Sequence, residues 1–138
     1  MTTASIKEKI LNDVVFIGLR STIGTIFIIH SMSKFSEGFG GFLASMGIPA
    51  EMQIPIALAE LIPGILLIIG ILSRLSASLL VIIMLGAIFV VKGAQSLIGD
   101  GGVEFDLMLL ASALVIMIAG PGRVSLAQAI KKIPRCLH

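Results

Sequence analysis

Four apolar stretches, each close to twenty residues long, dominate this sequence. They lie near residues 13–34, 54–73, 75–95 and 104–120. A helix of about 20 apolar residues, rising about 1.5 Å per residue, crosses the roughly 30 Å hydrocarbon core of a bilayer. Every backbone amide in lipid needs a partner inside its own segment, so these stretches must be helical. The sequence therefore predicts an all-α integral membrane four-helix bundle.

The composition supports a membrane protein and excludes an ordinary soluble domain. Hydrophobic residues make up 57% of the chain and charged residues only 13%, whereas soluble domains carry about 25% charged residues. We expect a single membrane domain over residues 1–138, in the cell membrane, with a tail at 121–138. The basic residues are scattered, so we expect the lipid bilayer as a partner and no nucleic acid.

The distribution of lysine and arginine predicts which side of the membrane each end occupies, because these residues are retained on the cytoplasmic side. One side of the predicted bundle carries Lys7, Lys9, Arg74, Arg123, Lys131, Lys132 and Arg135. The other side carries Lys34 and Lys92. We therefore expect both termini to be cytoplasmic.

The connecting segments have distinct compositions. Residues 35–53 mix aromatics with glycines and predict a re-entrant or half-buried segment at the outer interface, whereas residues 96–103 predict a simple turn. After the glycines and proline of residues 120–122, Ser125–Gln128 has the pattern of a capping box. We expect a short basic interfacial helix there, with a disordered tail as the alternative.

The few ionisable residues inside the spans are the most informative, because each costs about 2.5–3.5 kcal/mol in lipid unless it finds a partner. On the first helix, one face that should point into the bundle carries Arg20, Gly24, Phe27, His30, Ser31 and Lys34. Running neighbouring helices in opposite directions brings further charges to the same outer level. The predicted outer cluster consists of His30, Lys34, Glu60, Lys92 and Glu104. Arg20 lies nearer the cytoplasmic side.

Two interpretations of the predicted outer cluster follow. It binds a polar head group or relays protons, since histidine exchanges protons near neutral pH. Alternatively, Lys34 or Lys92 pairs with Glu60 or Glu104 and only holds the helices together. We expect no metal site, because no Glu-x-x-His pair is present, and no disulfide or cysteine-ligated centre, because Cys136 is the only cysteine. No intrinsic cofactor is therefore expected.

Several short motifs occur together in a fixed order. They are Arg20-x-x-x-Gly24-x-x-Phe27-x-x-His30-x-x-x-Lys34-Phe35, Ala59-Glu60-x-x-Pro63-Gly64, Gly70-x-x-x-Arg74 and Gly120-Pro121-Gly122-x-x-Ser125. In this order the chain resembles the DoxX family of small four-helix membrane proteins. It departs from the family pattern at Ser31, Lys92 and Ala127.

The resemblance implies a membrane subunit of an oxidoreductase complex, linked to quinone and associated with other membrane subunits, and not catalytic by itself. The ligand or proton-relay candidates are Arg20, His30, Lys34, Glu60, Lys92 and Glu104. One alternative is a structural or assembly subunit of a larger membrane enzyme. A small transporter is the second alternative.

Overall fold

The computed structural model describes residues 10–130, 134, 136 and 137, and the regular elements among them are helical. In chain order they are α1 (Ile10–Lys34), α2 (Glu37–Ser45), the 3-10 helix η1 (Ala50–Met52), α3 (Gln53–Ile69), α4 (Ser73–Gly86), the π-helix η2 (Ala87–Val91), α5 (Glu104–Ala119) and α6 (Leu126–Ala129). This is the all-α fold that the apolar stretches predict.

Three helical segments are long and apolar enough to cross a membrane: Ile10–Lys34, Ala50–Ile69 and Ser73–Val91. The chain is therefore a multi-pass membrane protein. The fourth predicted span corresponds to α5, which has 16 residues and is shorter than the about 20 residues of an ordinary span.

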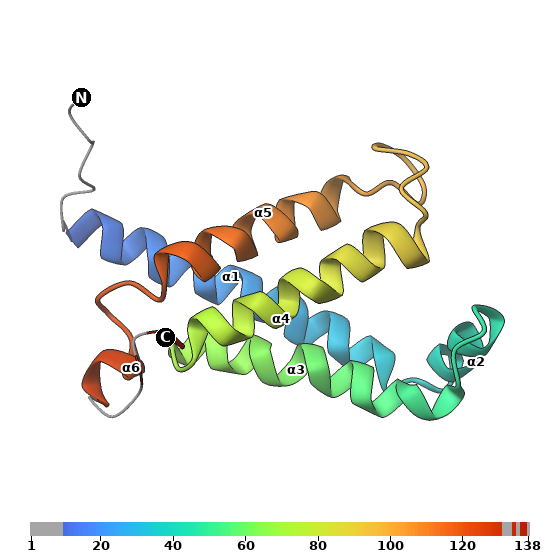
Figure 1. The fold of residues 1–138 in the computed structure, drawn as a ribbon, viewed down its shortest axis with the longest axis horizontal. Helices are drawn as coiled ribbons and strands as arrows, with labels where there is room; N and C mark the ends of the chain where they lie inside the picture. The colour runs from blue at the N-terminus through green and yellow to red at the C-terminus, as the bar shows by residue number, and fades with distance from the viewer. Residues whose placement is uncertain (1–9, 131–133, 135, 138) are drawn as a thin grey trace.

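The long helices α1, α3, α4 and α5 lie side by side, and consecutive ones run in opposite directions (Figure 1). The main packing contacts join α1 to α3, α3 to α4, and α4 to α5, while α1 touches α5 only lightly. Figure 1 places α2 and the α4–α5 loop at one end of the molecule and α6 at the other. We call these the α2 end and the α6 end.

Small residues and buried apolar side chains hold the helices together. Gly24 of α1 and Gly64 of α3 face one another so closely that a Cβ on Gly24 would lie 2.5 Å from the Gly64 carbonyl oxygen. The shared core includes Phe27, Leu67 and Leu80, each at most 1% exposed. Many large apolar side chains point outward instead, among them Ile62, Ile82, Phe89, Met108 and Ile118. Such an apolar exterior suits contact with lipid.

The turn between α3 and α4 begins earlier than the sequence predicts. We expected the second helix to reach residue 73, but α3 ends at Ile69. Gly70 adopts a left-handed conformation with φ of 76°, and its N–H donates to the Leu66 carbonyl oxygen at 2.9 Å. This is a common glycine helix stop, and α4 then starts at Ser73.

The next helix also differs at its C-terminal end. Instead of continuing to residue 95, α4 widens into η2 and stops at Val91. Gly93 and Ala94 follow with φ of 63° and 51°, which end the right-handed winding. A π-helix shifts the register of the residues that follow it and occurs frequently at functional sites.

Two connecting segments differ from the expectation, one by forming a helix and the other by lacking the predicted N-terminal cap. Residues 37–45 of the segment between α1 and α3 form α2, and the Gln53 side-chain amide donates to the carbonyl oxygens of Lys34 and Ser36 at 2.9 and 2.8 Å. The predicted capping box is wrong, because Ser125 occupies the N-cap of α6 without a side-chain capping bond. Lys131 and Lys132 lie outside the described residues.

Candidate functional site

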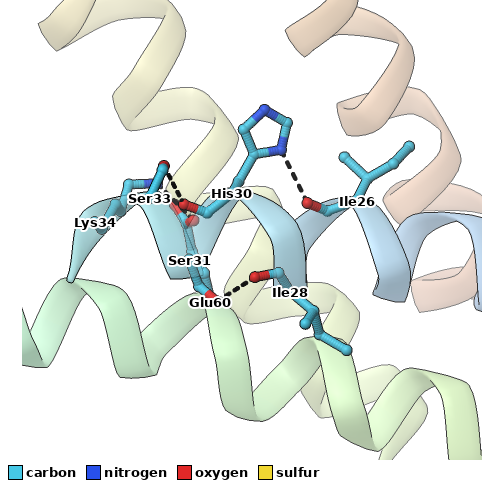
Figure 2. A network of polar contacts seen from close by, with 7 residues as sticks. All are labelled: Ile26, Ile28, His30, Ser31, Ser33, Lys34 and Glu60. Atoms are coloured by element: carbon cyan, nitrogen blue, oxygen red, sulfur yellow. Dashed lines mark hydrogen bonds and ion pairs between the residues drawn. The ribbon is translucent and has the colours of Figure 1, made fainter. Parts of the chain in front are cut away.

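A buried ion pair joins α1 to α3 at the α2 end. Lys34, the last residue of α1, places its Nζ 2.5 Å from the carboxylate Oε2 of Glu60. Glu60 is only 3% exposed, whereas the Lys34 side chain is 21% exposed. Figure 2 shows the two residues on their neighbouring helices. The close contact of Gly24 with Gly64 fixes the level at which these two helices meet. The pair therefore sits where the antiparallel packing of α1 and α3 brings its members together.

A second ion pair lies nearby but does not use the carboxylate expected from the sequence. Lys92 follows η2 and places its Nζ 2.6 Å from Oδ2 of Asp106 on α5. The same Nζ donates to the Gly102 carbonyl oxygen at 3.0 Å. Asp106 is 8% exposed, whereas Glu104 is exposed at the start of α5. Glu104 is thus absent from the two ion pairs, and its predicted pairing with either lysine is wrong.

The helical periodicity of α5 explains why Asp106, and not Glu104, pairs with Lys92. The buried residues of α5 are Asp106, Leu109, Ala113 and Ile116. These positions recur at steps of three and four and define the inward stripe. Glu104 lies two residues before Asp106 and therefore points elsewhere. This stripe was the signal in the sequence that could have identified Asp106.

His30 lies at the edge of the predicted face of α1 and does not contact the ion pairs. Its side chain is exposed and points away from Glu60 (Figure 2). Nδ1 lies 2.9 Å from the Ile26 carbonyl oxygen, and its ring packs against Phe105 with centroids 5.9 Å apart. A carbonyl oxygen only accepts hydrogen bonds, so Nδ1 carries the proton of this bond.

The Lys34–Glu60 pair separates two cavities at the α2 end. The smaller cavity, about 110 Å³, is lined by His30, Lys34, Glu60, Asp106 and apolar residues that include Phe27, Phe105 and Met84. The larger cavity, about 380 Å³, is lined by Lys34, Glu60 and apolar residues of α2, α3, α4 and η2, including Phe39, Phe42, Leu43, Gly86 and Val90. Both cavities touch Lys34, Glu60 and Ala87, so these residues form the shared wall. We call the larger space the α2 cavity.

The α2 cavity has the features of a site for a small, largely apolar ligand. Its volume falls within the about 300–1,000 Å³ of typical ligand pockets, which combine apolar walls with a few polar groups. Phe39 and Phe42 of α2 stack at 5.9 Å with an interplanar angle of 27°. The Lys34 Nζ lies 5.8 Å from the Phe39 ring centroid. A cation, a carboxylate and two aromatic rings are therefore available to one ligand.

A larger hollow lies between α3 and α4 and has an apolar lining. It measures about 490 Å³ between α3 and α4, and its lining includes Pro55, Leu58, Ile62, Leu66 and Leu79. No ionisable side chain lines it. We call it the α3–α4 groove. Because it faces outward and is apolar, lipid chains fit it as well as any other occupant.

The remaining predicted residue, Arg20, lies far from the α2 cavity. Fourteen residues separate it from Lys34 along α1, which corresponds to roughly 21 Å. It is 3% exposed and donates from Nη2 to the Val124 carbonyl oxygen at 2.7 Å. Of the predicted candidates, the structure brings Lys34 and Glu60 together, places His30 on the adjoining cavity and Lys92 beside Asp106, and leaves Arg20 at the α6 end.

Metal ligation has no support among the residues that the structure describes. They contain no group of three or more histidine, cysteine, aspartate or glutamate side chains that could hold a metal ion. Cys136 is exposed and carries a free thiol.

Comparison with known proteins identifies a matching family model and two similar proteins. The family model described as DoxX matches residues 15–93, which run from within α1 to two residues beyond η2. A protein named "Putative oxidoreductase CatD" from Bacillus subtilis (strain 168) is 36% identical over 104 residues, covering 74% of this chain and 76% of the relative. The "Uncharacterized membrane protein Rv3486" of Mycobacterium tuberculosis is 30% identical over 130 residues, covering 83% and 80%. No solved structure matches significantly.

Proposed function

Because the chain belongs to the DoxX family, we propose that it is a membrane subunit of an oxidoreductase complex and that its α2 cavity binds a quinone. One relative carries an oxidoreductase name. The chain supplies the membrane-embedded ligand site, and partner subunits exchange electrons with the bound quinone. Under this proposal it is not a complete enzyme by itself.

The observation that carries the proposal is an apolar cavity of about 380 Å³ with one buried ion pair in its wall. A quinone ring is flat and apolar apart from its carbonyl oxygens, which accept hydrogen bonds. The Lys34 ammonium donates to such an oxygen, while the Phe39 and Phe42 rings in the cavity wall offer apolar contact to the quinone ring. The isoprenoid tail of the quinone extends along the apolar lining of the cavity toward the lipid.

Proton transfer is the chemistry that these side chains are suited to provide. Oxidation of a quinol releases two protons and two electrons, and reduction of a quinone takes up the same number. Glu60 touches the α2 cavity and the smaller cavity, and His30 lines the smaller cavity. We propose that Glu60 and His30 carry protons away from or toward the ligand, while the electrons pass to or from a partner subunit.

The orientation in the membrane is part of the same proposal. We propose four spans in the cell membrane, with α5 as the shortest, and cytoplasmic termini. If the spans alternate in direction, Arg74 and Arg123 fall on the same side as the basic residues near both chain ends, whereas the other side carries Lys34 and Lys92. An excess of basic residues marks the cytoplasmic side, so the α2 cavity lies toward the outer side.

A cavity-filling substitution tests the quinone site. Gly86 lines the α2 cavity, has helical dihedral angles, and has no atom within 4 Å of an added Cβ. Gly86→Leu should therefore fold but occupy ligand space, weakening the binding of ubiquinone-1 by about tenfold or more. Binding is measured by titrating the purified protein in nanodiscs.

Gly18→Leu is the matched control for this titration. Gly18 is exposed on α1, and nothing lies within 4 Å of its added Cβ. We expect its quinone affinity to equal that of the wild type. Equal affinity of Gly86→Leu and wild type, or no binding by the wild type, would contradict a quinone site in the α2 cavity.

One observation favours a second function, that of a structural subunit. Both ion pairs join separate elements, Lys34–Glu60 between α1 and α3, and Lys92–Asp106 between the end of η2 and α5. Such pairs suffice to fix helix packing without any ligand. A purely structural role predicts that Glu60→Gln loses partner subunits in proportion to its loss of stability, whereas the quinone proposal predicts an assembled complex with impaired turnover.

A further inference from the structure

Arg20 is a buried cation whose hydrogen-bonding capacity is largely unused. It is 3% exposed, and its single hydrogen bond to the described part of the chain runs from Nη2 to the Val124 carbonyl oxygen at 2.7 Å. Its Nε and Nη1 are buried without a partner among the described residues. The carboxylate of Asp13, two turns earlier on α1, is engaged by Arg123 at 2.9 Å. A neutral carbonyl oxygen does not balance the charge of a buried guanidinium.

Other unpartnered polar groups belong to the same end of the molecule. The Oγ atoms of Ser73 and Ser125 and the Nε of Arg74 are likewise buried without partners within the described part of the chain. Ser73 is 0% exposed and is the first residue of α4, so it also lies at the positive end of that helix dipole. Each of these groups donates hydrogen bonds.

The turn between α3 and α4 places Arg20 beside Ser125, and Ser73 and Arg74 begin the helix that follows this turn. A Cβ added to Gly70 would collide with Arg20 Nη1 and would lie 2.7 Å from the Cβ of Ser125. The Ala127 N–H donates to the Gly70 carbonyl oxygen at 3.1 Å, which holds the segment after α5 against the turn. Arg20, the turn and Ser125 are therefore in mutual contact. Ser125 and Arg74 are partly exposed, so these two residues border the molecular surface.

We propose that Arg20, Ser73, Arg74 and Ser125, here called the Arg20 site, bind a phosphate group. The set presents two guanidinium groups, two hydroxyls and a helix N-terminus, and it contains no carboxylate to neutralise them. Phosphate oxygens accept several such bonds at once, and arginine forms its strongest hydrogen bonds with oxyanions. The phosphate belongs either to a lipid head group or to a free phosphate ion.

Native mass spectrometry of the delipidated full-length protein in detergent tests the Arg20 site. One series receives phosphatidylglycerol and the other receives sodium phosphate, and bound masses are recorded for wild type and Arg20→Gln. Loss of charge-assisted hydrogen bonds should weaken retention of the bound species by roughly ten- to a hundredfold. Retention of phosphatidylglycerol alone identifies a head group, and retention displaced by inorganic phosphate identifies a site for the free ion.

Two further variants keep the test decisive. Arg123→Gln removes a cation from the same end, but one that pairs with Asp13, so its retention should match the wild type. If Arg20→Gln fails to fold, the double variant Ser73→Ala and Ser125→Ala removes two donors without removing charge and should weaken retention by about tenfold. Equal retention by wild type and the folded Arg20 or serine variant, or an equal loss in Arg123→Gln, would overturn the proposal.

Discussion

Glu60 is held in an apolar interior by one cation. It is 3% exposed, and Lys34 neutralises it from 2.5 Å. Removing one member of a buried pair leaves the other uncompensated, which costs far more than losing an exposed pair. Lys34 is 21% exposed at the end of α1, so part of its charge reaches the interface when its partner is lost.

Glu60→Gln should therefore destabilise the protein by on the order of 2 kcal/mol. Glu104→Gln is the matched control, because Glu104 is exposed and belongs to neither ion pair in the described structure. We expect that substitution to change the free energy of unfolding by less than about 0.5 kcal/mol. Circular dichroism during unfolding in mixed micelles measures both values, and equal effects of the two substitutions would rule out a special role for Glu60.

The sequence offered Lys34 with Glu60 as one of several possible pairs and did not indicate Asp106, for a physical reason. Lys34 and Glu60 occupy apolar spans in which a charge needs a partner, so their meeting follows from the antiparallel order of the helices. Glu104 and Asp106 both stand in the first turn of α5, where the helix dipole tolerates either. Only the packing of α5 decides that Asp106 faces inward.

The glycine contact between α1 and α3 sets the level of the Lys34–Glu60 pair. A Cβ on Gly24 would lie 2.5 Å from the Gly64 carbonyl oxygen, which is backbone and cannot move aside alone. The two helices must then separate or slide. A change in this contact therefore shifts α1 relative to α3 and displaces Lys34 from Glu60 at the α2 end.

Gly24→Ala should lower the free energy of unfolding by about 1–3 kcal/mol, because the added methyl group overpacks the contact. Gly18→Ala on the same helix has open space around the new Cβ and should stabilise by up to about 1 kcal/mol through helix propensity. Unfolding in mixed micelles compares them. The same sign of effect for both substitutions would show that the close contact does not exist.

The sequence predicted the long helices better than their ends. Apolar length places α1, α3, α4 and α5, since lipid leaves the backbone no alternative to a helix. The stop at Gly70 required knowledge that this glycine adopts φ of 76°. The π-helix over Ala87–Val91 depends on the packing of α4 and leaves no distinct pattern in the sequence, although it lines the α2 cavity.

At the scale of the whole molecule, the two ends have different chemistry. The α2 end pairs its buried charges with one another and encloses the α2 cavity. The α6 end collects unpartnered donors around Arg20. An apolar exterior between them suits the hydrocarbon core. In the proposed orientation, the ligand site faces the outer side and the Arg20 site lies among cytoplasmic head groups.

Photolabelling with an azidoquinone tests the central claim most directly. The full-length protein in nanodiscs is irradiated with the probe, and labelled peptides are mapped by mass spectrometry, with excess ubiquinone-1 as competitor. We predict competed labelling within Phe39–Met46 and Ile83–Val91, which line the α2 cavity. Labelling confined to Leu58–Leu66 of the α3–α4 groove, or labelling that ubiquinone-1 does not reduce, would contradict the account.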